Sequence, residues 1–234
     1  MSTVLTTPAQ PMVWPGLIGN LPGIYSGEYP PEYSQYNTQY PGSKEVIQWV
    51  WYDTQTYVSG TTVSLTFFQS GPGGRTIDLT NMDVAGQLAA PKAFLLRAPR
   101  FYVKQRPLAS TAAAAASAQV SDLDNVAQLI NTGTYSCIIG SKNYGTYPLA
   151  VLTAGCGVYG VMGTAAATVV DVAQNGWPEA RSIFTLSKPQ FLAPQINFAV
   201  TLTWPAPLTL AGGTPAGSIP LMVMWDGDLI RPVQ

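Results

Sequence analysis

The chain has 234 residues, of which 47% are hydrophobic and only 10% are charged, and its net charge is −1. It contains no histidine, which excludes Ser–His and Cys–His catalytic machinery and removes the commonest metal ligand. The near-zero net charge gives no electrostatic basis for sequence-specific or non-specific binding of nucleic acid.

The low charge also bears on the surface of the protein. A typical globular domain is about 25% charged. We therefore expect much of this surface either to meet other protein or to carry uncharged polar side chains. The length suits one large domain or two small ones.

Residues 1–44 are predicted to form an extended N-terminal arm rich in proline and tyrosine. The stretch 23–42 reads GIYSGEYPPEYSQYNTQYPG and has only two charged side chains. Proline has no N–H donor and interrupts regular ladders, whereas disordered segments are usually poor in aromatic residues. We expect the arm to be ordered by contact with a neighbouring copy of the protein; the alternative is a flexible terminus. The predicted inter-subunit contacts are Tyr25, Tyr29, Tyr33, Tyr36 and Tyr40.

Three β-strands are predicted after the arm. EVIQWVWY (45–52) is rich in β-branched and aromatic residues, and TTVSLTFFQ (61–69) alternates apolar and polar side chains. KAFLLRAPRFYVKQ (92–105) is the third, and its Pro99 predicts an edge position or a bulge. The side chains of the second strand expected to face the core are Val63, Leu65 and Phe67.

One helix is predicted within residues 110–133, which read STAAAAASAQVSDLDNVAQLINTG. Alanine has high helix propensity, and apolar residues follow at helical spacing. Ser121 and Asp124 resemble a capping box, so the regular helix is expected to start near Ser121 and to end at Gly133.

Further strands are expected in the second half of the chain, at 134–141, 147–152, 180–186, 195–204 and 218–233. In 195–204 the side chains expected to face the core are Ile196, Phe198, Val200, Leu202 and Trp204. Eight or nine strands with long loops and no βαβ rhythm predict an all-β antiparallel sandwich. We expect an eight-stranded jelly roll over residues 45–234, with one short inserted helix.

The stretch 143–170 carries no charged side chain and is long enough to span a bilayer. Because it contains Pro148 and several glycines, two buried strands with a glycine-rich connection are favoured over a spanning helix. Nothing at the N-terminus reads as a signal peptide. Cys137 and Cys156 are expected to be buried free thiols, the alternative being one disulfide bridge.

Candidate chemical motifs are weak. Asp226 and Asp228 in WDGD favour a turn over a calcium loop, since further oxygen ligands are missing. SGPGGR (70–75) favours a surface turn over a phosphate loop, and SDLD (121–124) favours helix capping over an acid–base pair. No catalytic, cofactor or metal site is assigned and no enzyme is expected; the alternative is a glycoside hydrolase with two opposed carboxylates.

An aromatic group on the first two strands has two interpretations. It comprises Trp49, Trp51, Tyr52, Phe67 and Phe68. Alternating strand faces favour packing in the core for most of these rings, and the alternative is a platform that stacks on sugars. The second interpretation supports a carbohydrate-binding jelly-roll module or a phage receptor-binding protein as the alternative function.

The arm, the sandwich and three stretches of sequence carry a resemblance to a known family. The stretches are YDTQTYVSGTTVSLTFFQ (52–69), APKAFLLRAPRFYVKQ (90–105) and LIRPVQ (229–234). The chain resembles viral jelly-roll capsid proteins, in particular the single-jelly-roll coat subunits of tailless icosahedral phages, some of which enclose a membrane.

The resemblance implies a structural protein of the virion that assembles in the host cytoplasm into an icosahedral shell. Its implied partners are other copies of itself, through arms that cross onto adjacent subunits, and a second capsid protein. It implies no cofactor and no sequence-specific nucleic acid. An internal membrane is compatible with the family, but the chain has no basic patch for lipid headgroups.

Overall fold

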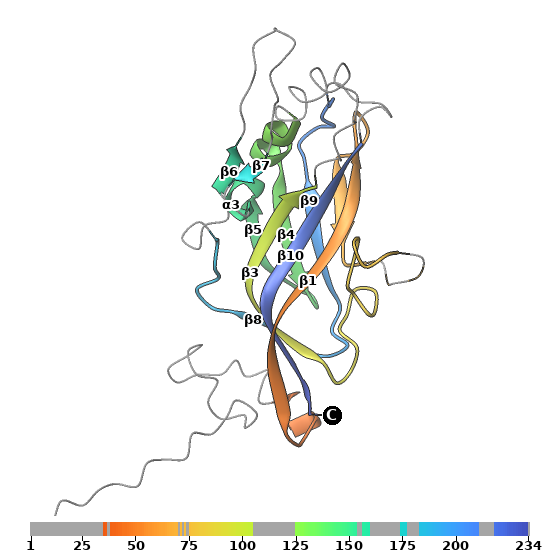
Figure 1. Ribbon diagram of the computed structural model, residues 1–234, viewed down its shortest axis with the longest axis vertical. Coiled ribbons are helices and arrows are strands. Elements are labelled where there is room, and N and C mark those ends of the chain that lie inside the picture. Colours follow the sequence, from red (N-terminus) through yellow and green to blue (C-terminus); the bar gives the residue numbers. More distant parts are fainter. Residues whose placement is uncertain are drawn as a thin grey trace, which may run out of the picture.

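The computed structural model shows an all-β sandwich of two antiparallel four-stranded sheets (Figure 1). The structure describes residues 35–36, 38–69, 71, 73, 75–104, 125–153, 183–210 and 218–233, together with the backbone of 156–159 and 174–176.

The two sheets are called sheet A and sheet B. Sheet A has the order β1 (Lys44–Val58), β10 (Ser218–Pro232), β3 (Ala93–Val103) and β8 (Gln190–Leu192). Sheet B has the order β2 (Ser64–Phe67), β9 (Phe198–Thr203), β4 (Thr134–Ile139) and β5 (Lys142–Pro148). A separate antiparallel pair consists of β6 (Cys156–Tyr159) and β7 (Gln174–Gly176).

The strands of the sandwich pair in a nested order. β1 pairs with β10, β2 with β9, β3 with β8, and β4 with β5, all of them antiparallel. The first strand of the sandwich therefore lies beside the last, the second beside the last but one, and so on to the central hairpin. This arrangement brings the two ends of the described domain together, and Val233 N donates to Ser43 O at 3.1 Å.

The long ribbon of β1 and β10 extends below the body of the sandwich in Figure 1, where the C-terminus lies. A loop covers the free edge of β1 around Tyr52. The Asn81 side chain accepts from Tyr52 N at 2.8 Å and donates to Val50 O at 2.7 Å, while Thr80 Oγ1 donates to Tyr52 O. These contacts satisfy backbone groups that would otherwise offer a template for pairing with another chain.

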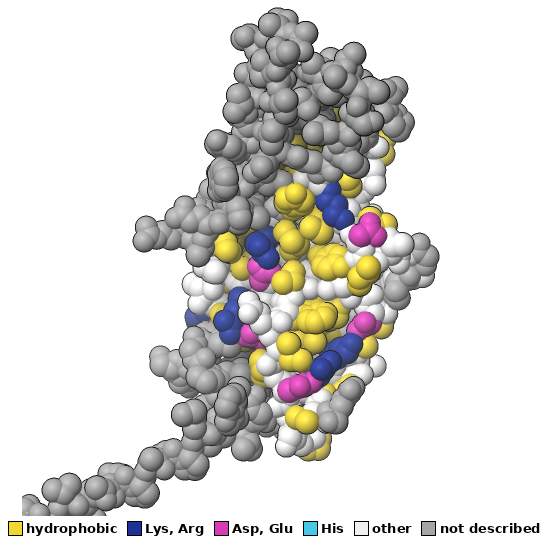
Figure 2. All heavy atoms as spheres, in the orientation of Figure 1, with side chains coloured by type: hydrophobic (Ala, Val, Ile, Leu, Met, Phe, Trp, Pro, Cys, Tyr) yellow, Lys and Arg dark blue, Asp and Glu magenta, His cyan; other side chains and the backbone are white. Residues whose placement is uncertain are grey.

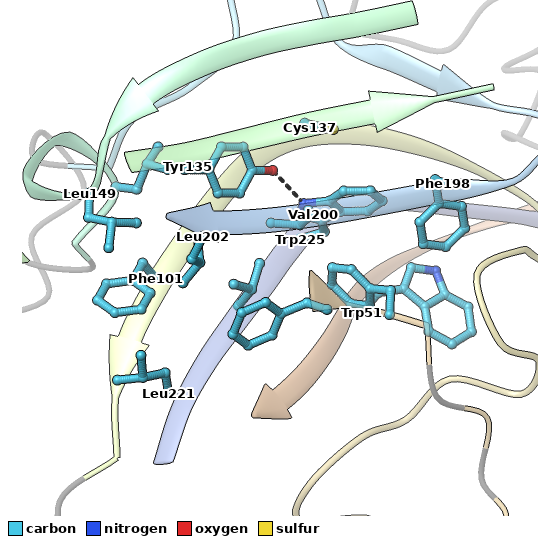
Figure 3. Packing of buried hydrophobic residues seen from close by; sticks show 14 of the residues in the cluster. Trp51, Phe101, Tyr135, Cys137, Leu149, Phe198, Val200, Leu202, Leu221 and Trp225 are labelled. Atoms are coloured by element: carbon cyan, nitrogen blue, oxygen red, sulfur yellow. Dashed lines mark hydrogen bonds between the residues drawn. The ribbon is translucent and has the colours of Figure 1, made fainter. Parts of the chain in front are cut away.

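The main core lies between the two sheets. Phe68, Phe198 and Trp225 pack against one another with ring centroids 4.7–5.8 Å apart. Trp225 Nε1 of sheet A donates to the Tyr135 hydroxyl of sheet B at 2.9 Å (Figure 3). Burying apolar side chains stabilises each by about 1.5–3 kcal/mol, and the hydrogen bond satisfies the two polar groups carried into the core.

The predicted helix is present over residues 125–132, and it ends before Gly133 as expected. Its buried side chains include Val126, Leu129 and Ile130. Trp204 Nε1 donates to Leu129 O at 3.1 Å, which satisfies one terminal carbonyl of the helix. A Cβ at Gly133 would collide with the side chain of Leu149, so the glycine permits close packing here. The proposed cap at 121–124 lies outside the described residues.

Two predicted strands are wrong. Within 147–152 only the first two residues are extended, because β5 ends at Pro148 and a helical turn, α3 (Leu149–Leu152), follows. Leu149 and Leu152 point into the core from that turn, so their spacing of three is helical. Of the segment 180–186, the described residues 183–186 form no strand.

The motif WDGD is not a turn, which corrects the prediction for Asp226 and Asp228. Both lie inside β10, where the register with β3 shifts between Asp226 and Gly227. Gly227 fits because any Cβ there would collide with the Leu95 carbonyl oxygen. Pro99 lies beside this bulge, beyond the point where β8 stops pairing with β3, so the predicted edge or bulge position is confirmed.

Two residues expected in the core are exposed instead. Val63 and Ile196 precede β2 and β9, and each falls just outside its ladder. The remaining predicted alternation in β9 is confirmed, since Phe198, Val200 and Leu202 are buried. The alternation of apolar and polar residues predicts which side chains within these strands are buried, but it does not show at which residue strand pairing begins.

The uncharged stretch 143–170 does not begin as a buried strand. β5 is the edge strand of sheet B and is mostly exposed or half-buried. No helix in the described part of the chain is long and apolar enough to cross a membrane.

Cys137 lies in β4 and is a buried free thiol, so it forms no bridge with Cys156. Burial raises the pKa of the Cys137 thiol to about 12. The side chain of Cys156 lies outside the description.

Candidate functional site

Sheet A carries a second apolar cluster on the face that points away from the main core. Successive side chains of a strand point to opposite faces. Accordingly Leu229 belongs to the main core, whereas Ile230 belongs to the second cluster. The second cluster consists of Tyr36, Ala93, Leu95, Phe191 and Ile230, with Tyr40, Val46 and Ala193 packed against it. This outward side is called the outer face of sheet A.

Tyr36 is the side chain that covers this cluster. It is 2% exposed, its ring lies 5.8 Å from that of Phe191, and its hydroxyl donates to Pro91 O at 2.8 Å. Lys44 Nζ lies 5.0 Å from the ring centroid. Burial, with a smaller contribution from Tyr40, raises the pKa of Tyr36 to about 12, and burial lowers the pKa of Lys44. The residues just before β1 are therefore fixed on the outer face.

This position bears on the predicted contacts of the arm. Tyr36 packs against its own chain and has almost no surface left for a neighbouring subunit. Tyr40 is half-buried, with its ring 5.3 Å from that of Tyr36, and its contact with another copy remains a prediction. Tyr25, Tyr29 and Tyr33 lie outside the described residues.

Two ion pairs follow the cluster along the outer face. Arg97 Nη2 lies 2.5 Å from Asp228 Oδ2, and Arg100 Nη2 lies 2.6 Å from Asp226 Oδ1. Both arginines come from β3 and both aspartates from β10. The two acidic residues of the WDGD motif thus neutralise arginines of the adjacent strand.

An apolar patch lies beyond these pairs, called here the outer patch. Its side chains are half-buried except for that of Ile77, which is 74% exposed at its margin. Figure 2 shows hydrophobic side chains gathered over β1, β10 and β3 among the charged pairs. The outer patch comprises Val50, Tyr52, Tyr102, Met222 and Met224 from the three strands, and Ile77, a loop residue whose carbonyl accepts from the Tyr52 hydroxyl.

The outward side of sheet B is different in kind, since hydroxyl side chains run across it in rows. One row follows the register Thr66, Thr201, Ser136 and Thr146, and the next follows Ser64, Thr203 and Thr134. These side chains are exposed or half-buried. Sheet B therefore carries uncharged polar side chains of the kind expected from the low charge of the sequence.

Charges are segregated between the two sheets. β1 carries three charged residues, β3 two and β10 three, whereas the four strands of sheet B carry only Lys142. Ile138 on sheet B is also exposed, as are Val63 and Ile196 beside it. Since the cores of protein–protein interfaces are depleted in charge, sheet B offers a surface suited to association.

One charged site is buried. Asp53 is fully buried and accepts from Arg75 Nη1 at 2.6 Å, from Phe68 N at 2.7 Å and from Gln55 Nε2 at 3.2 Å. Phe68 has a positive φ of 64°, which this contact helps to hold. Arg75, expected in a surface turn, thus ties its loop to β1 through the Asp53 carboxylate and the Thr54 carbonyl.

Most of the aromatic group is core, as the favoured interpretation predicted. Trp51, Phe67 and Phe68 are buried, and Tyr52 is half-buried in the outer patch. Trp49 is 39% exposed, with its ring edge-on to Trp51 at 6.0 Å. The described residues therefore present one exposed indole and not a strip of rings.

The described side chains include no group of three or more Cys, Asp or Glu residues that could hold a metal ion. The outer face of sheet A was missed by the sequence interpretation, although LMVMW in β10 carries a signal. A strand that is apolar on both faces predicts that both faces are covered.

Comparison with protein-family models, with curated proteins and with solved structures found no match.

Proposed function

We propose that the protein is a structural coat subunit that associates with copies of itself to form an icosahedral viral shell, and that it performs no catalysis. The sandwich is proposed to be a jelly roll. The arm is proposed to contact neighbouring subunits through its tyrosines, and a second capsid protein is proposed as a further partner in the shell. On this proposal the protein resides in the virion after assembly in the host cytoplasm.

The nested strand order supports the jelly roll. A jelly roll has eight antiparallel strands in two sheets with Greek-key connections, and viral capsid domains are among the proteins that use it. A hairpin rolled into two sheets pairs first with last strand, second with last but one, and third with last but two. β1 with β10, β2 with β9 and β3 with β8 follow this order.

The observation that carries the functional proposal is the nearly uncharged outward side of sheet B. Its hydroxyl rows and exposed Ile138 form a broad surface with one charged residue, at the end of an edge strand. A subunit surrounded by neighbours needs such a surface, because a charge buried without a partner at an interface costs several kcal/mol. The tyrosine-rich arm supplies further amphipathic contact area.

A matched pair of variants tests this surface. Thr203→Arg places a charge at the end of β9, an inner strand of sheet B, and Thr56→Arg places the same charge on a strand position of sheet A that is also exposed. We expect Thr203→Arg to weaken self-association at least tenfold, about 1.4 kcal/mol, in sedimentation velocity. Thr56→Arg should leave it unchanged. Equal association of both variants and the parent chain would remove sheet B as the contact.

The alternative function is a carbohydrate-binding module or a phage receptor-binding protein. The exposed ring of Trp49 is the one feature among the described residues that favours it. Trp49→Ala should abolish retention on a glycan array and leave the fold intact if this alternative holds. No retention by the parent chain would dismiss it.

A further inference from the structure

We infer that residues 23–34 bind back onto the outer patch of sheet A of the same chain, so that the isolated subunit covers this patch with its own tyrosine segment. The inference concerns the subunit before association and does not depend on the proposed shell.

Tyr36 anchors the C-terminal end of this segment to the outer face of sheet A. Tyr36 is already buried against Phe191 and Ile230 on the outer face, and its hydroxyl is bonded to Pro91 O. The segment 23–34 therefore leaves from a fixed point on this face. It continues a contact that the chain has already made.

The segment is long enough to extend from this anchor to the outer patch. Ile230 in the anchor cluster and Met222 in the outer patch lie on the same strand, eight residues apart, which corresponds to about 26 Å. Twelve residues of extended or polyproline-like backbone span about 37 Å. Residues 23–34 can therefore cross the ion pairs and reach the far end of the patch.

The side chains of the segment and those of the outer patch are chemically suited to contact each other. The segment carries Tyr25, Tyr29 and Tyr33, and the patch carries Met222 and Met224. Methionine sulfur makes favourable contacts with aromatic rings and adapts its shape to them. The two tyrosines of the patch, one from each flanking strand, add rings of the same kind.

The charges of the segment also find partners on the way. Its two charged residues are Glu28 and Glu32. The Arg97 side chain is 44% exposed beside its ion pair with Asp228. A guanidinium has five N–H donors, so one that binds a carboxylate through part of its edge retains donors for a second.

The patch of a dilute subunit binds the chain's own segment in preference to that of another copy. A short tether keeps the segment at an effective concentration of about 1 mM near the patch. A second copy at micromolar concentration competes with this at a disadvantage of about a thousandfold. In dilute solution the chain's own segment is the occupant.

Peroxide oxidation of methionine tests the inference on the full-length chain. The rates of oxidation at Met222 and Met224 are measured by peptide mass spectrometry in the parent chain and in the variant Tyr25→Ser/Tyr29→Ser/Tyr33→Ser. We expect the variant to be oxidised at least about threefold faster, since a tether at ~1 mM occupies most of a site with a dissociation constant of ~0.3 mM. Buried Met82 reports whether the fold is intact.

Two controls decide the assignment. Val4→Ser/Leu5→Ser/Val13→Ser changes three apolar residues outside the segment and should oxidise at the parent rate. Protection of the parent chain should persist over a hundredfold dilution. Equal rates in the parent and the tyrosine variant would overturn the inference. Protection lost on dilution would also overturn it and would assign the patch to a second copy, leaving the proposed shell untouched.

Discussion

Asp53 is a buried charged residue whose side chain should contribute several kcal/mol to the free energy of unfolding. It is fully buried and joins β1 to the Arg75 loop and to the backbone of Phe68. Removing one partner of a buried ion pair costs about 3–5 kcal/mol, because the other charge is left uncompensated. Asp53→Ala should therefore lower the free energy of unfolding by about this amount, discounted toward the lower end because Arg75 keeps some contact with solvent.

The matched control is Asp83→Ala. Asp83 also pairs with a basic side chain, Lys92, but the side chains of that pair are 46% and 32% exposed. Exposed pairs contribute about 0–1 kcal/mol. Urea unfolding measures the free energy of unfolding of the two variants. Similar decreases in both would show that the buried Asp53 ion pair contributes no more to stability than an exposed pair.

Cys137 makes stability depend on pH in the alkaline range. Burial raises the pKa of its thiol from the ordinary 9.0 to about 12, so the folded chain holds this proton more tightly than the unfolded chain does. Its contribution is fully present below pH 9 and is lost as the pH rises toward 12, at up to about 1.4 kcal/mol per pH unit. Tyr36 and Tyr135, whose pKa values are also raised by burial, act in the same direction above pH 10.

Urea unfolding of the parent chain and of Cys137→Ala between pH 8 and pH 11 measures how the free energy of unfolding depends on pH. Both should lose stability above pH 9, and the variant should lose less. Parallel curves for the two proteins would show that the thiol does not ionise on unfolding in this range.

At the scale of elements, the bulge between β10 and β3 depends on a glycine. A Cβ at Gly227 would collide with the Leu95 carbonyl oxygen, which is backbone and cannot turn away. Gly227→Ala should therefore force the two strands apart and lower the free energy of unfolding by about 3 kcal/mol. Gly73→Ala is the control, since nothing lies within 4 Å of a Cβ there. An equal thermal midpoint for the two variants would mean that the bulge can shift at little cost.

The sequence predicted some elements well and others poorly, for physical reasons. β9 was recognisable because Phe198, Val200 and Leu202 alternate with polar residues. The turn at α3 was not, because a short apolar run reads equally as strand or helix. WDGD was misread because Asp-Gly marks turns in most contexts, and only the partner strand shows that Gly227 makes room for Leu95.

The candidate surfaces were less predictable than the strands. The cluster that buries Tyr36 contains residues that are distant in sequence, such as Phe191 and Ile230, and no local sequence pattern relates them. The segregation of charge between the sheets likewise appears only once the strand order is known. The tyrosine content of the arm did indicate a docking segment, and Tyr36 shows that one of its rings binds the chain's own sheet.

At the scale of the whole molecule, the two faces of the sandwich suggest different tasks. Sheet A carries nearly all of the charged strand residues and, on its outer face, the anchor of the arm, whereas sheet B is nearly free of charge. A subunit that associates through an uncharged face should do so independently of ionic strength, because screening weakens only charged contacts. Association driven by apolar burial is not weakened by added salt.

Whether this chain is a self-associating structural subunit is tested most directly by its solution mass. Light scattering on the full-length chain, across concentration and from low to high salt, measures this mass. We expect discrete oligomers or shell-sized particles that form as concentration rises and that persist at high salt. A monomer of 24.9 kDa at every concentration and salt would contradict it.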